Sequence, residues 1–328
     1  MVKRNEKIDL YKGILILLVV VGHFQRDLLH DIIFLFHMPL FFMISGMLQK
    51  RMNLISIVYL KNKISNLVLP YICYLLLDYV VCKHEFSLLS FVKMCWGGRA
   101  FDGVYWYITC FIATLFLFHF LLEHFSDKTV KCLIIAGGGI SVIESYIAES
   151  IHLLKSPGVP WNLDVALLAV VYLAIGFYHK ERINLWLAKG SKKSDIFAVL
   201  TTCILVVFCI FNYWGGRRVY YFDMKQLFYK ELFMAIVIPC AFGIVLCRLV
   251  YWIDIVDTFK WLKKGLCYLG QMTLPIMYLH VPLNTWKVEV KYGRIVYMLI
   301  GVCVPIVFTV LLNRFTIMRK LFGLPDLR

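Results

Sequence analysis

The sequence predicts an all-α, polytopic integral membrane protein with about ten transmembrane helices and both termini in the cytoplasm. Of its 328 residues, 61% are hydrophobic and only 17% are charged, whereas about 25% of the residues in an average soluble domain are charged. The mean hydropathy is +0.76. Because a soluble domain needs polar groups to cover its surface, this composition excludes an ordinary cytosolic protein and a disordered one.

Ten segments are long and apolar enough for helices that cross a hydrocarbon core, which takes about 20 residues. They are residues 9–29, 31–49, 66–82, 104–122, 131–151, 162–179, 195–213, 231–250, 267–284 and 295–313. The basic, then apolar N-terminus resembles a signal peptide but lacks a small-residue cleavage site, so we expect a retained first helix. With no repeat and no soluble segment in view, residues 1–328 are predicted to form a single transmembrane domain without a fused soluble domain.

The net charge of +15 is explained mainly by topology. Of the 35 Lys and Arg residues, 23 fall on the side of the predicted bundle that holds the N-terminus. Cytoplasmic loops carry such an excess, so the distribution places both termini in the cytoplasm. A nucleic-acid-binding protein can be equally basic, but it is not usually this apolar, and we expect no nucleic-acid partner.

The first predicted span carries Asp9, Lys12 and His23. At 100° per residue, Lys12 and His23 lie within 20° of each other on one helix face, about 16 Å apart along the axis. Ionisable groups inside a membrane are costly and are candidates for function. The alternative is that Asp9 and Lys12 lie among the lipid headgroups and that His23 caps the outer end of the helix.

The second predicted span contains His37, Pro39, Ser45 and Gly46. Pro39 removes a backbone donor and is expected to kink the helix there. A kink beside a histidine and a glycine would widen a cavity within the membrane. A routine proline kink, with His37 satisfied by a neighbour, is equally consistent with this pattern.

Later spans add polar and aromatic candidates for the lining of a cavity. Taken singly, each is more typical of a satisfied polar contact or of an interfacial residue than of a catalytic group. These candidates are Trp106, Tyr107, Asn162, Asp164, Tyr278 and His280. The 11 cysteines form no Cys-x-x-Cys pair and no zinc-like spacing with histidine, so no metal site is expected.

Several segments together resemble the acyltransferase-3 family of membrane O-acyltransferases. The two most specific are KIDLYKGILILLVVVGH (Lys7–His23) and FHMPLFFMISGML (Phe36–Leu48). Supporting segments are KNKISNLVLPY (61–71), VYWYITCFI around Trp106, and LGQMTLPIMYLH (269–280). A further segment, PWNLDVALLAVVYLAIGF (160–177), resembles the branch with fucose 4-O-acetylase-like and capsular polysaccharide O-acetyltransferases.

Two positions depart from the family pattern. Lys12 stands where the family commonly has arginine, which replaces a bidentate phosphate contact with a point charge. Asn66 stands where many relatives carry another basic residue. The basic residues Lys61 and Lys63 are therefore the stronger candidates for anion ligands in that segment.

The resemblance implies an O-acetyltransferase of the bacterial inner membrane that uses acetyl-CoA made in the cytoplasm. The acceptor would be a hydroxyl of a capsular, exopolysaccharide or lipid-linked glycan, and membrane lipids would surround the protein. Donor phosphates are expected at four basic residues: Lys12, Arg51, Lys61 and Lys63.

The resemblance also implies roles for the polar groups of the first two spans. His23 would act as a general base or as a transient acyl acceptor. Asp9 would pair with Lys12, while His37 and Ser45 would line the cavity and donate hydrogen bonds to the oxyanion.

Two other functions fit part of the sequence. A transporter or flippase for polysaccharide or lipid-linked sugar would also have many spans with charges inside the membrane. A non-enzymatic scaffold or sensor would not require Lys12 and His23 on one helix face. The first two motifs together favour the acyltransferase over both.

Overall fold

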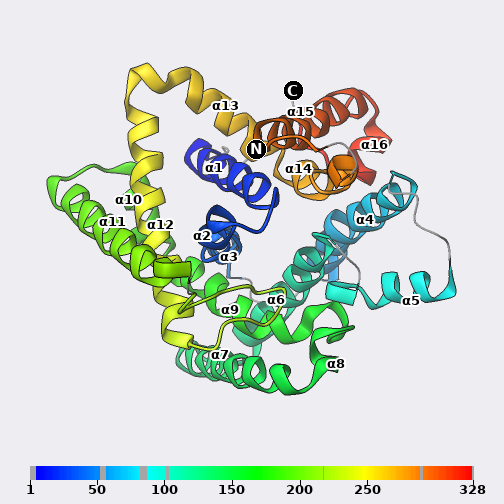
Figure 1. Cartoon of the computed structure of the whole chain (residues 1–328), viewed down its shortest axis with the longest axis horizontal. Helices are drawn as coiled ribbons and strands as arrows, with labels where there is room; N and C mark the ends of the chain where they lie inside the picture. The colour runs from blue at the N-terminus through cyan, green and yellow to red at the C-terminus, as the bar shows by residue number, and fades with distance from the viewer. Residues whose placement is uncertain are drawn as a thin grey trace. The chain divides into compact units, whose positions relative to one another are not determined.

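The computed structural model describes residues 5–51, 57–81, 87–100, 103–216, 218–288 and 291–326. These residues form α-helices joined by loops and short 3-10 turns (Figure 1). The described part of the chain has no strand beyond one isolated bridge between Asp223 and Phe228. The predicted all-α class is therefore confirmed.

The helices follow one another along the chain as α1 (Glu6–Gly22), α2 (Leu28–Phe34), α3 (His37–Met47), α4 (Ile57–Val81), α5 (Leu88–Trp96), α6 (Tyr105–His124), α7 (Asp127–Ser150), α8 (His152–Lys155), α9 (Leu163–Tyr178), α10 (Lys180–Ala188), α11 (Lys192–Tyr213), α12 (Leu232–Ile255), α13 (Lys260–Gln271), α14 (Thr273–Leu279), α15 (Arg294–Leu312) and α16 (Thr316–Leu321). The 3-10 turns are η1 (Gly98–Ala100), η2 (Pro160–Asn162), η3 (Trp214–Gly216), η4 (Asp257–Phe259) and η5 (Pro282–Val288).

Seven helical segments of the described chain are long and apolar enough to cross a membrane. They are Leu28–Met47, Tyr105–His124, Asp127–Ser150, Pro160–Tyr178, Lys192–Gly216, Leu232–Ile255 and Arg294–Leu312. Each coincides with a span expected from the sequence, which confirms a polytopic membrane protein.

The other three predicted spans look different in the structure. Helix α1 has 17 residues, and the apolar part of α4, Ser65–Val81, is similarly short. The ninth predicted span, 267–284, is divided among α13, α14 and η5. The total of ten spans and the cytoplasmic termini remain predictions.

The expected kink at Pro39 is wrong. The interruption lies earlier, at Leu35 and Phe36, where α2 ends and α3 begins. Pro39 is the third residue of α3, and the first four N–H groups of a helix have no partner within the helix. A proline there removes no helical hydrogen bond, and so the break precedes it.

The chain divides into two compact units. Unit 1 comprises Met1–Gln49, Tyr172–Met224 and Phe228–Thr273. Unit 2 comprises Lys50–Val171, Lys225–Leu227 and Leu274–Arg328. The predicted single domain stays a prediction, since compact units of this kind occur within single domains as well as between them.

Within unit 1, α1 packs along α13 through glycines (Figure 1). A Cβ atom on Gly13 would lie 1.9 Å from the carbonyl oxygen of Leu266, and one on Gly270 would lie 1.8 Å from that of Asp9. Only glycine permits so close a backbone approach, as is common between membrane helices. Asp9 is buried at this contact.

Charged residues tie the first turn of α1 to α12 and α13. Lys7 and Lys263 both contact Asp254, with N–O distances of 3.0 and 2.8 Å, and Lys263 also lies 3.0 Å from Glu6. Hydrogen bonds to Asp254 and Glu6 raise the pKa of Lys263 above its usual value. The amine is therefore charged at neutral pH.

Candidate functional site

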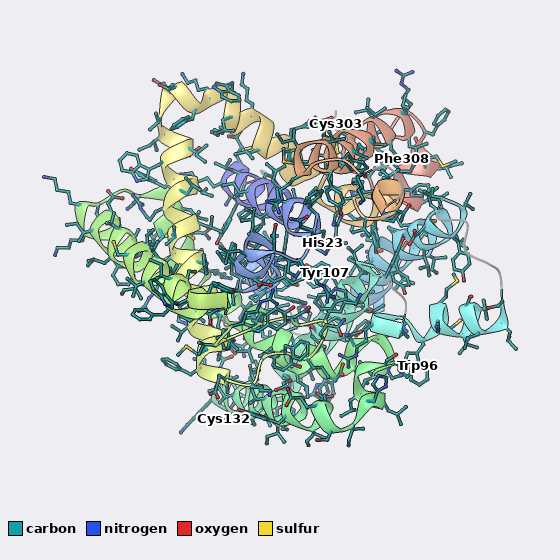
Figure 2. All side chains as sticks on the ribbon, viewed as in Figure 1. His23, Trp96, Tyr107, Cys132, Cys303 and Phe308 are labelled. Atoms are coloured by element: carbon teal, nitrogen blue, oxygen red, sulfur yellow. The ribbon has the colours of Figure 1, made fainter. Side chains whose placement is uncertain are left out.

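His23 lies at the end of α1 (Figure 2), as its C-cap residue. Its ring is half-buried, and Nδ1 donates a hydrogen bond to the carbonyl oxygen of Val19 at 2.8 Å. In the neutral ring the proton therefore sits on Nδ1 and the lone pair on Nε2. The helix ends here rather than at residue 29, as expected if His23 caps the end of the helix. The hydrogen bond through Nδ1 does not use the basic nitrogen, Nε2.

Two further histidines make the same kind of bond. Nδ1 of His30 donates to the carbonyl oxygen of Gly22, the last residue of α1, at 2.7 Å. Nδ1 of His37 donates to the carbonyl oxygen of Ile33, in the last turn of α2, at 2.8 Å. The last carbonyls of a helix have no partner within the helix. The histidines thus satisfy helix ends and hold their own tautomers fixed.

The three histidine rings surround one phenylalanine. The ring centroid of Phe34 lies 5.4 Å from that of His23, 3.8 Å from that of His30 and 4.7 Å from that of His37. The rings of His23 and His37 are 6.4 Å apart, edge to face. We call these four residues the histidine cluster. The structure thus brings together His23 and His37, two residues that the sequence singled out separately.

The sequence contains a signal for His30. His23, His30 and His37 are spaced seven residues apart, a spacing that returns to one face of a helix after two turns. The three histidines do not lie on one helix, because the helical structure is interrupted after Gly22 and again after Phe34. Their rings meet because the chain turns back between α1, α2 and α3. Phe34 carried no polar signal at all.

Asp31 adds a charged contact beside the cluster. It is buried next to His30 in α2, and its carboxylate lies 2.9 Å from Nε of Arg218. Arg218 belongs to the aromatic and basic loop that follows α11. The sequence gives no sign that this loop contacts α2.

The basic residues expected to bind the donor lie in different parts of the chain. Lys12 is half-buried on α1 in unit 1. In unit 2, Arg51 is exposed and makes an ion pair with Asp127 at 2.9 Å. Lys61 and Lys63 lie on α4, and their side chains are outside the described residues. Donor binding by these four residues remains a prediction.

Unit 2 holds a buried charged group that we call the charge centre, made of Arg99, Asn162 and Asp164. Arg99 forms an ion pair with Asp164, and both side chains are almost completely buried. The backbone N–H of Arg99 donates to Oδ1 of Asn162 at 2.8 Å, so the turns η1 and η2 are joined. Asp164 lies in the first turn of α9, where a negative charge is favourable. Both predicted residues therefore have structural partners.

The aromatic candidates also lie in unit 2. Trp106 and Tyr107 are buried in the first turn of α6. Tyr278 stacks on Tyr74 with ring centroids 4.4 Å apart. His280 is buried, and its Nδ1 donates to the carbonyl oxygen of Ile276 at 2.9 Å. A role for these four in substrate binding remains a prediction.

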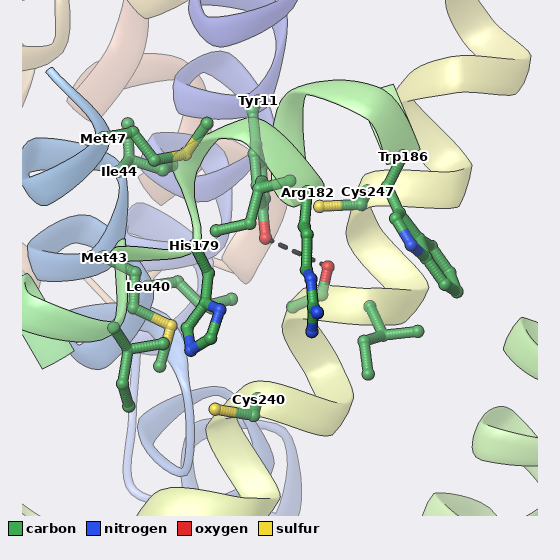
Figure 3. Close-up of a pocket in the computed structure, with 14 residues that line it drawn as sticks. Tyr11, Leu40, Met43, Ile44, Met47, His179, Arg182, Trp186, Cys240 and Cys247 are labelled. Atoms are coloured by element: carbon green, nitrogen blue, oxygen red, sulfur yellow. Dashed lines mark hydrogen bonds between the residues drawn. The ribbon is translucent and has the colours of Figure 1, made fainter. Parts of the chain in front are cut away.

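A cavity of about 290 Å³ lies in unit 1 beside α3 (Figure 3). Leu40, Met43 and Ile44 line it, whereas His37 and Ser45 are not among its lining residues. Among the described residues, no group of three or more His, Cys, Asp or Glu side chains is arranged to hold a metal ion.

Comparison with known families gives a match over nearly the whole chain. The sequence model of the family described as an acyltransferase domain covers residues 5–318. No curated protein and no solved structure matches the chain.

Proposed function

The chain belongs to the acyltransferase-3 family, and on this premise we propose that it is a membrane O-acetyltransferase. It takes an acetyl group from acetyl-CoA and transfers it to a hydroxyl of a cell-surface or lipid-linked glycan. The motif resemblance to fucose 4-O-acetylase-like and capsular enzymes supports this acceptor class and a place in the bacterial inner membrane. The family match favours an acyltransferase over a transporter or a scaffold.

The observation that carries the proposal is the hydrogen bond from Nδ1 of His23 to Val19, at 2.8 Å. A sugar hydroxyl is a poor nucleophile at neutral pH, so it needs a base as it attacks. A ring whose Nδ1 proton is held by the backbone presents Nε2 as that base. Such assistance typically contributes about 10²–10⁴-fold to the rate.

In the proposed reaction, Nε2 of His23 takes the proton of the acceptor hydroxyl while its oxygen attacks the thioester carbonyl. The resulting intermediate expels the sulfur of CoA as its carbon–sulfur bond breaks. The proton on His23 then passes to the departing thiolate. Ser45 is proposed to donate a hydrogen bond to the oxyanion, and His37, whose Nδ1 proton is held by the Ile33 carbonyl, is proposed to donate through Nε2 in its protonated form. Lys12 is proposed to pair with Asp9 and to contact a donor phosphate, and Arg51, Lys61 and Lys63 are proposed as further phosphate ligands.

A second route uses the same nitrogen as a nucleophile. Nε2 attacks the thioester and CoA leaves as a thiolate. The acetyl group then passes from the imidazole to the glycan oxygen, the hydroxyl proton passes to the thiolate, and neutral His23 is regenerated. Acetylated His23, found by peptide mass spectrometry after incubation with acetyl-CoA alone, would select this route.

The test replaces His23 with asparagine, whose side-chain amide retains a donor for the Val19 carbonyl but removes the basic nitrogen. We expect the turnover of purified His23→Asn, measured as release of CoA in the presence of acceptor glycan, to fall about 10²–10⁴-fold.

The matched control is His124→Asn. His124 makes the same kind of bond, from Nδ1 to the carbonyl oxygen of Phe120 at 2.9 Å, at the end of α6. This variant should keep its turnover within a few-fold. Full turnover in His23→Asn would show that His23 is only a helix cap, and equal losses in both variants would assign the effect to capping.

A further inference from the structure

The cavity in unit 1 is lined by three helical faces. Four lining residues of α3 (Leu40, Met43, Ile44, Met47) and four of α12 (Cys240, Gly243, Ile244, Cys247) recur at intervals of three and four. A third row continues from α9 into α10, as Ile175, His179, Arg182, Ile183 and Trp186. Residues at these intervals share one face of a helix, so α3 and α12 each turn a continuous apolar stripe towards the cavity, whereas the third row also carries His179 and Arg182.

Tyr11 of α1 lies on the remaining side of the cavity. Its hydroxyl donates to the carbonyl oxygen of Gly243 at 3.3 Å (Figure 3). A Cβ atom on Gly243 would approach Leu40 to 2.9 Å. Glycine at this position therefore leaves room beside the α3 face.

The polar residues of the cavity come from one short segment at the end of a predicted span. Helix α9 ends at Tyr178, and the exposed residues His179 and Arg182 follow at once. Their side chains extend from this segment in the same direction (Figure 3). Within the described residues neither makes an ion pair, and Arg182 is the one permanently charged residue among those that line the cavity.

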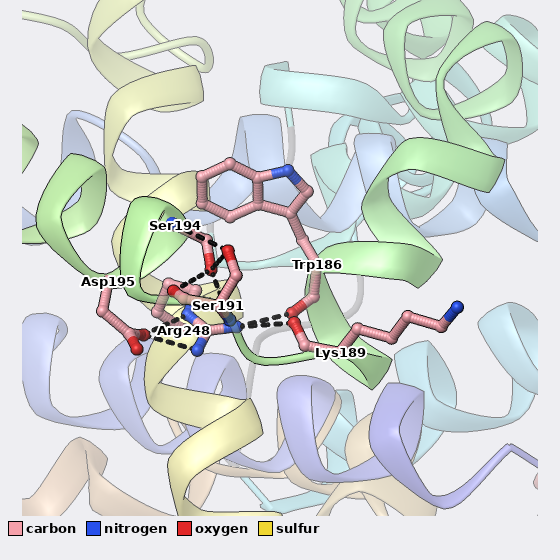
Figure 4. Close-up of polar contacts among 6 residues, drawn as sticks. All are labelled: Trp186, Lys189, Ser191, Ser194, Asp195 and Arg248. Carbon is pink, nitrogen blue, oxygen red and sulfur yellow. Dashed lines mark hydrogen bonds and ion pairs between the residues drawn. The ribbon is translucent and has the colours of Figure 1, made fainter.

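The wall that carries Trp186 is held in place by Arg248 (Figure 4). The Arg248 side chain is buried, and Nη1 donates to the carbonyl oxygens of Trp186 and Lys189 at 3.2 and 3.1 Å. Nε donates to Asp195 of α11 at 3.0 Å. These contacts fix α10 against α11 and α12, so the cavity is formed before any ligand enters.

We propose that this cavity binds one hydrocarbon chain of an anionic phospholipid, with the lipid phosphate against Arg182. The apolar stripes match the chain, and the unpaired guanidinium matches the headgroup. Arg182 and Trp186 lie just beyond a spanning helix, where headgroups are found and where tryptophan is enriched. The site does not depend on the proposed acetyl transfer.

A CoA thioester fits the cavity less well. CoA carries several phosphates, whereas Arg182 is the single permanent cation among the described lining residues. A purely zwitterionic lipid would place a second positive charge near Arg182. An anionic lipid such as phosphatidylglycerol is therefore the favoured occupant.

The first test measures lipid bound to the full-length protein. Protein in nanodiscs of phosphatidylcholine and phosphatidylglycerol is released into detergent and analysed by native mass spectrometry. We expect the wild type to retain phosphatidylglycerol preferentially, and Arg182→Gln to bind it about fivefold more weakly, as for one exposed basic residue lost beside an anionic headgroup.

Arg314→Gln is the matched control. Arg314 is exposed and follows the end of another spanning helix, α15, but it does not line the cavity. Equal phosphatidylglycerol retention by the Arg182 and Arg314 variants would overturn the site. Loss in Arg182→Gln alone supports it, provided that both variants elute as monodisperse protein.

The second test reports on the chain rather than the headgroup. Cys240 lines the cavity, whereas Cys203 is an exposed residue of α11. We expect phosphatidylglycerol to slow modification of Cys240 by N-ethylmaleimide at least several-fold, with no effect at Cys203. Protection of Cys240 by acetyl-CoA in place of phosphatidylglycerol, or by neither, would overturn the lipid assignment.

Discussion

The histidine cluster of unit 1 and the charge centre of unit 2 use polar side chains in opposite ways. In the cluster, Nδ1 of each histidine donates a hydrogen bond to a helix-end carbonyl, at 2.7 to 2.8 Å. In the neutral ring, Nε2 then carries the lone pair. In the charge centre, Arg99 is matched to Asp164 and to the Lys225 carbonyl. Burial and polarity alone therefore do not identify a reactive group.

A hydrogen bond can orient a polar side chain and leave it able to react, whereas a buried ion pair uses the charge of both its members. A ring fixed through Nδ1 gains orientation and keeps its basic nitrogen. In a buried ion pair, the attraction between the two charges offsets the desolvation cost of both, and each member is held in place by that requirement. We therefore expect substitutions in the charge centre to act mainly on stability and those at His23 mainly on turnover.

The largest expected effect on stability is that of Arg99→Met. It leaves the buried carboxylate of Asp164 without its cation, and breaking a buried pair in this way costs about 3–5 kcal/mol. Thermal unfolding of detergent-solubilised protein, followed by circular dichroism, would measure the loss.

The double variant Arg99→Met with Asp164→Leu tests the interpretation of that loss. Removing both charges should recover part of the stability, since the Asp164 carboxylate is removed together with its cation. If Arg99→Met keeps full stability but loses turnover, the charge centre takes part in the reaction and the proposed difference between the two regions is wrong.

A smaller effect is expected for His30→Ala in the cluster. The variant loses the hydrogen bond to Gly22 and the contact with Phe34, and a typical hydrogen bond contributes about 0.5–1.5 kcal/mol. We expect a stability loss of this size and turnover within about tenfold of wild type, measured on the same preparations. A loss of turnover as large as that of His23→Asn would make His30 an equal participant in the reaction.

The smallest effect is expected where ion pairs are more accessible. Lys260 is 74% exposed and its partner Asp257 is 85% exposed, and solvent screens such pairs. Lys260→Met should change the free energy of unfolding by less than about 1 kcal/mol, and by less still at high salt. A loss comparable to that of Arg99→Met would mean that burial does not determine how much these ion pairs contribute to the free energy of unfolding.

Most of the helical framework was predictable from apolar length. The spans expected near α6, α7, α11, α12 and α15 are present because each is a long uninterrupted run. Pro39 does not kink α3, since a proline kinks a helix only where its missing N–H is needed. The region 267–284 passes the same length criterion but forms short helices. The sequence does not predict these breaks, because composition does not reveal where tertiary contacts end a helix.

The site was predictable residue by residue but not as a constellation. The motif residues His23 and His37 do lie together, yet the ring between them, Phe34, is apolar and gives no chemical signal. Asp164 stood out as an intramembrane carboxylate, but its partner Arg99 sits 65 residues earlier. Such pairs form when segments far apart in the sequence pack against each other, and spacing along the sequence does not show which segments do so.

The short length of α1 has a consequence for the bilayer. Seventeen residues span about 26 Å, less than a typical hydrocarbon thickness of about 30 Å. With Lys12 at headgroup depth, His23 would lie about 16 Å further in, near the midplane. In the proposed reaction, a donor from the cytoplasm and an acceptor from the opposite side would then each cross about half of the membrane to reach His23.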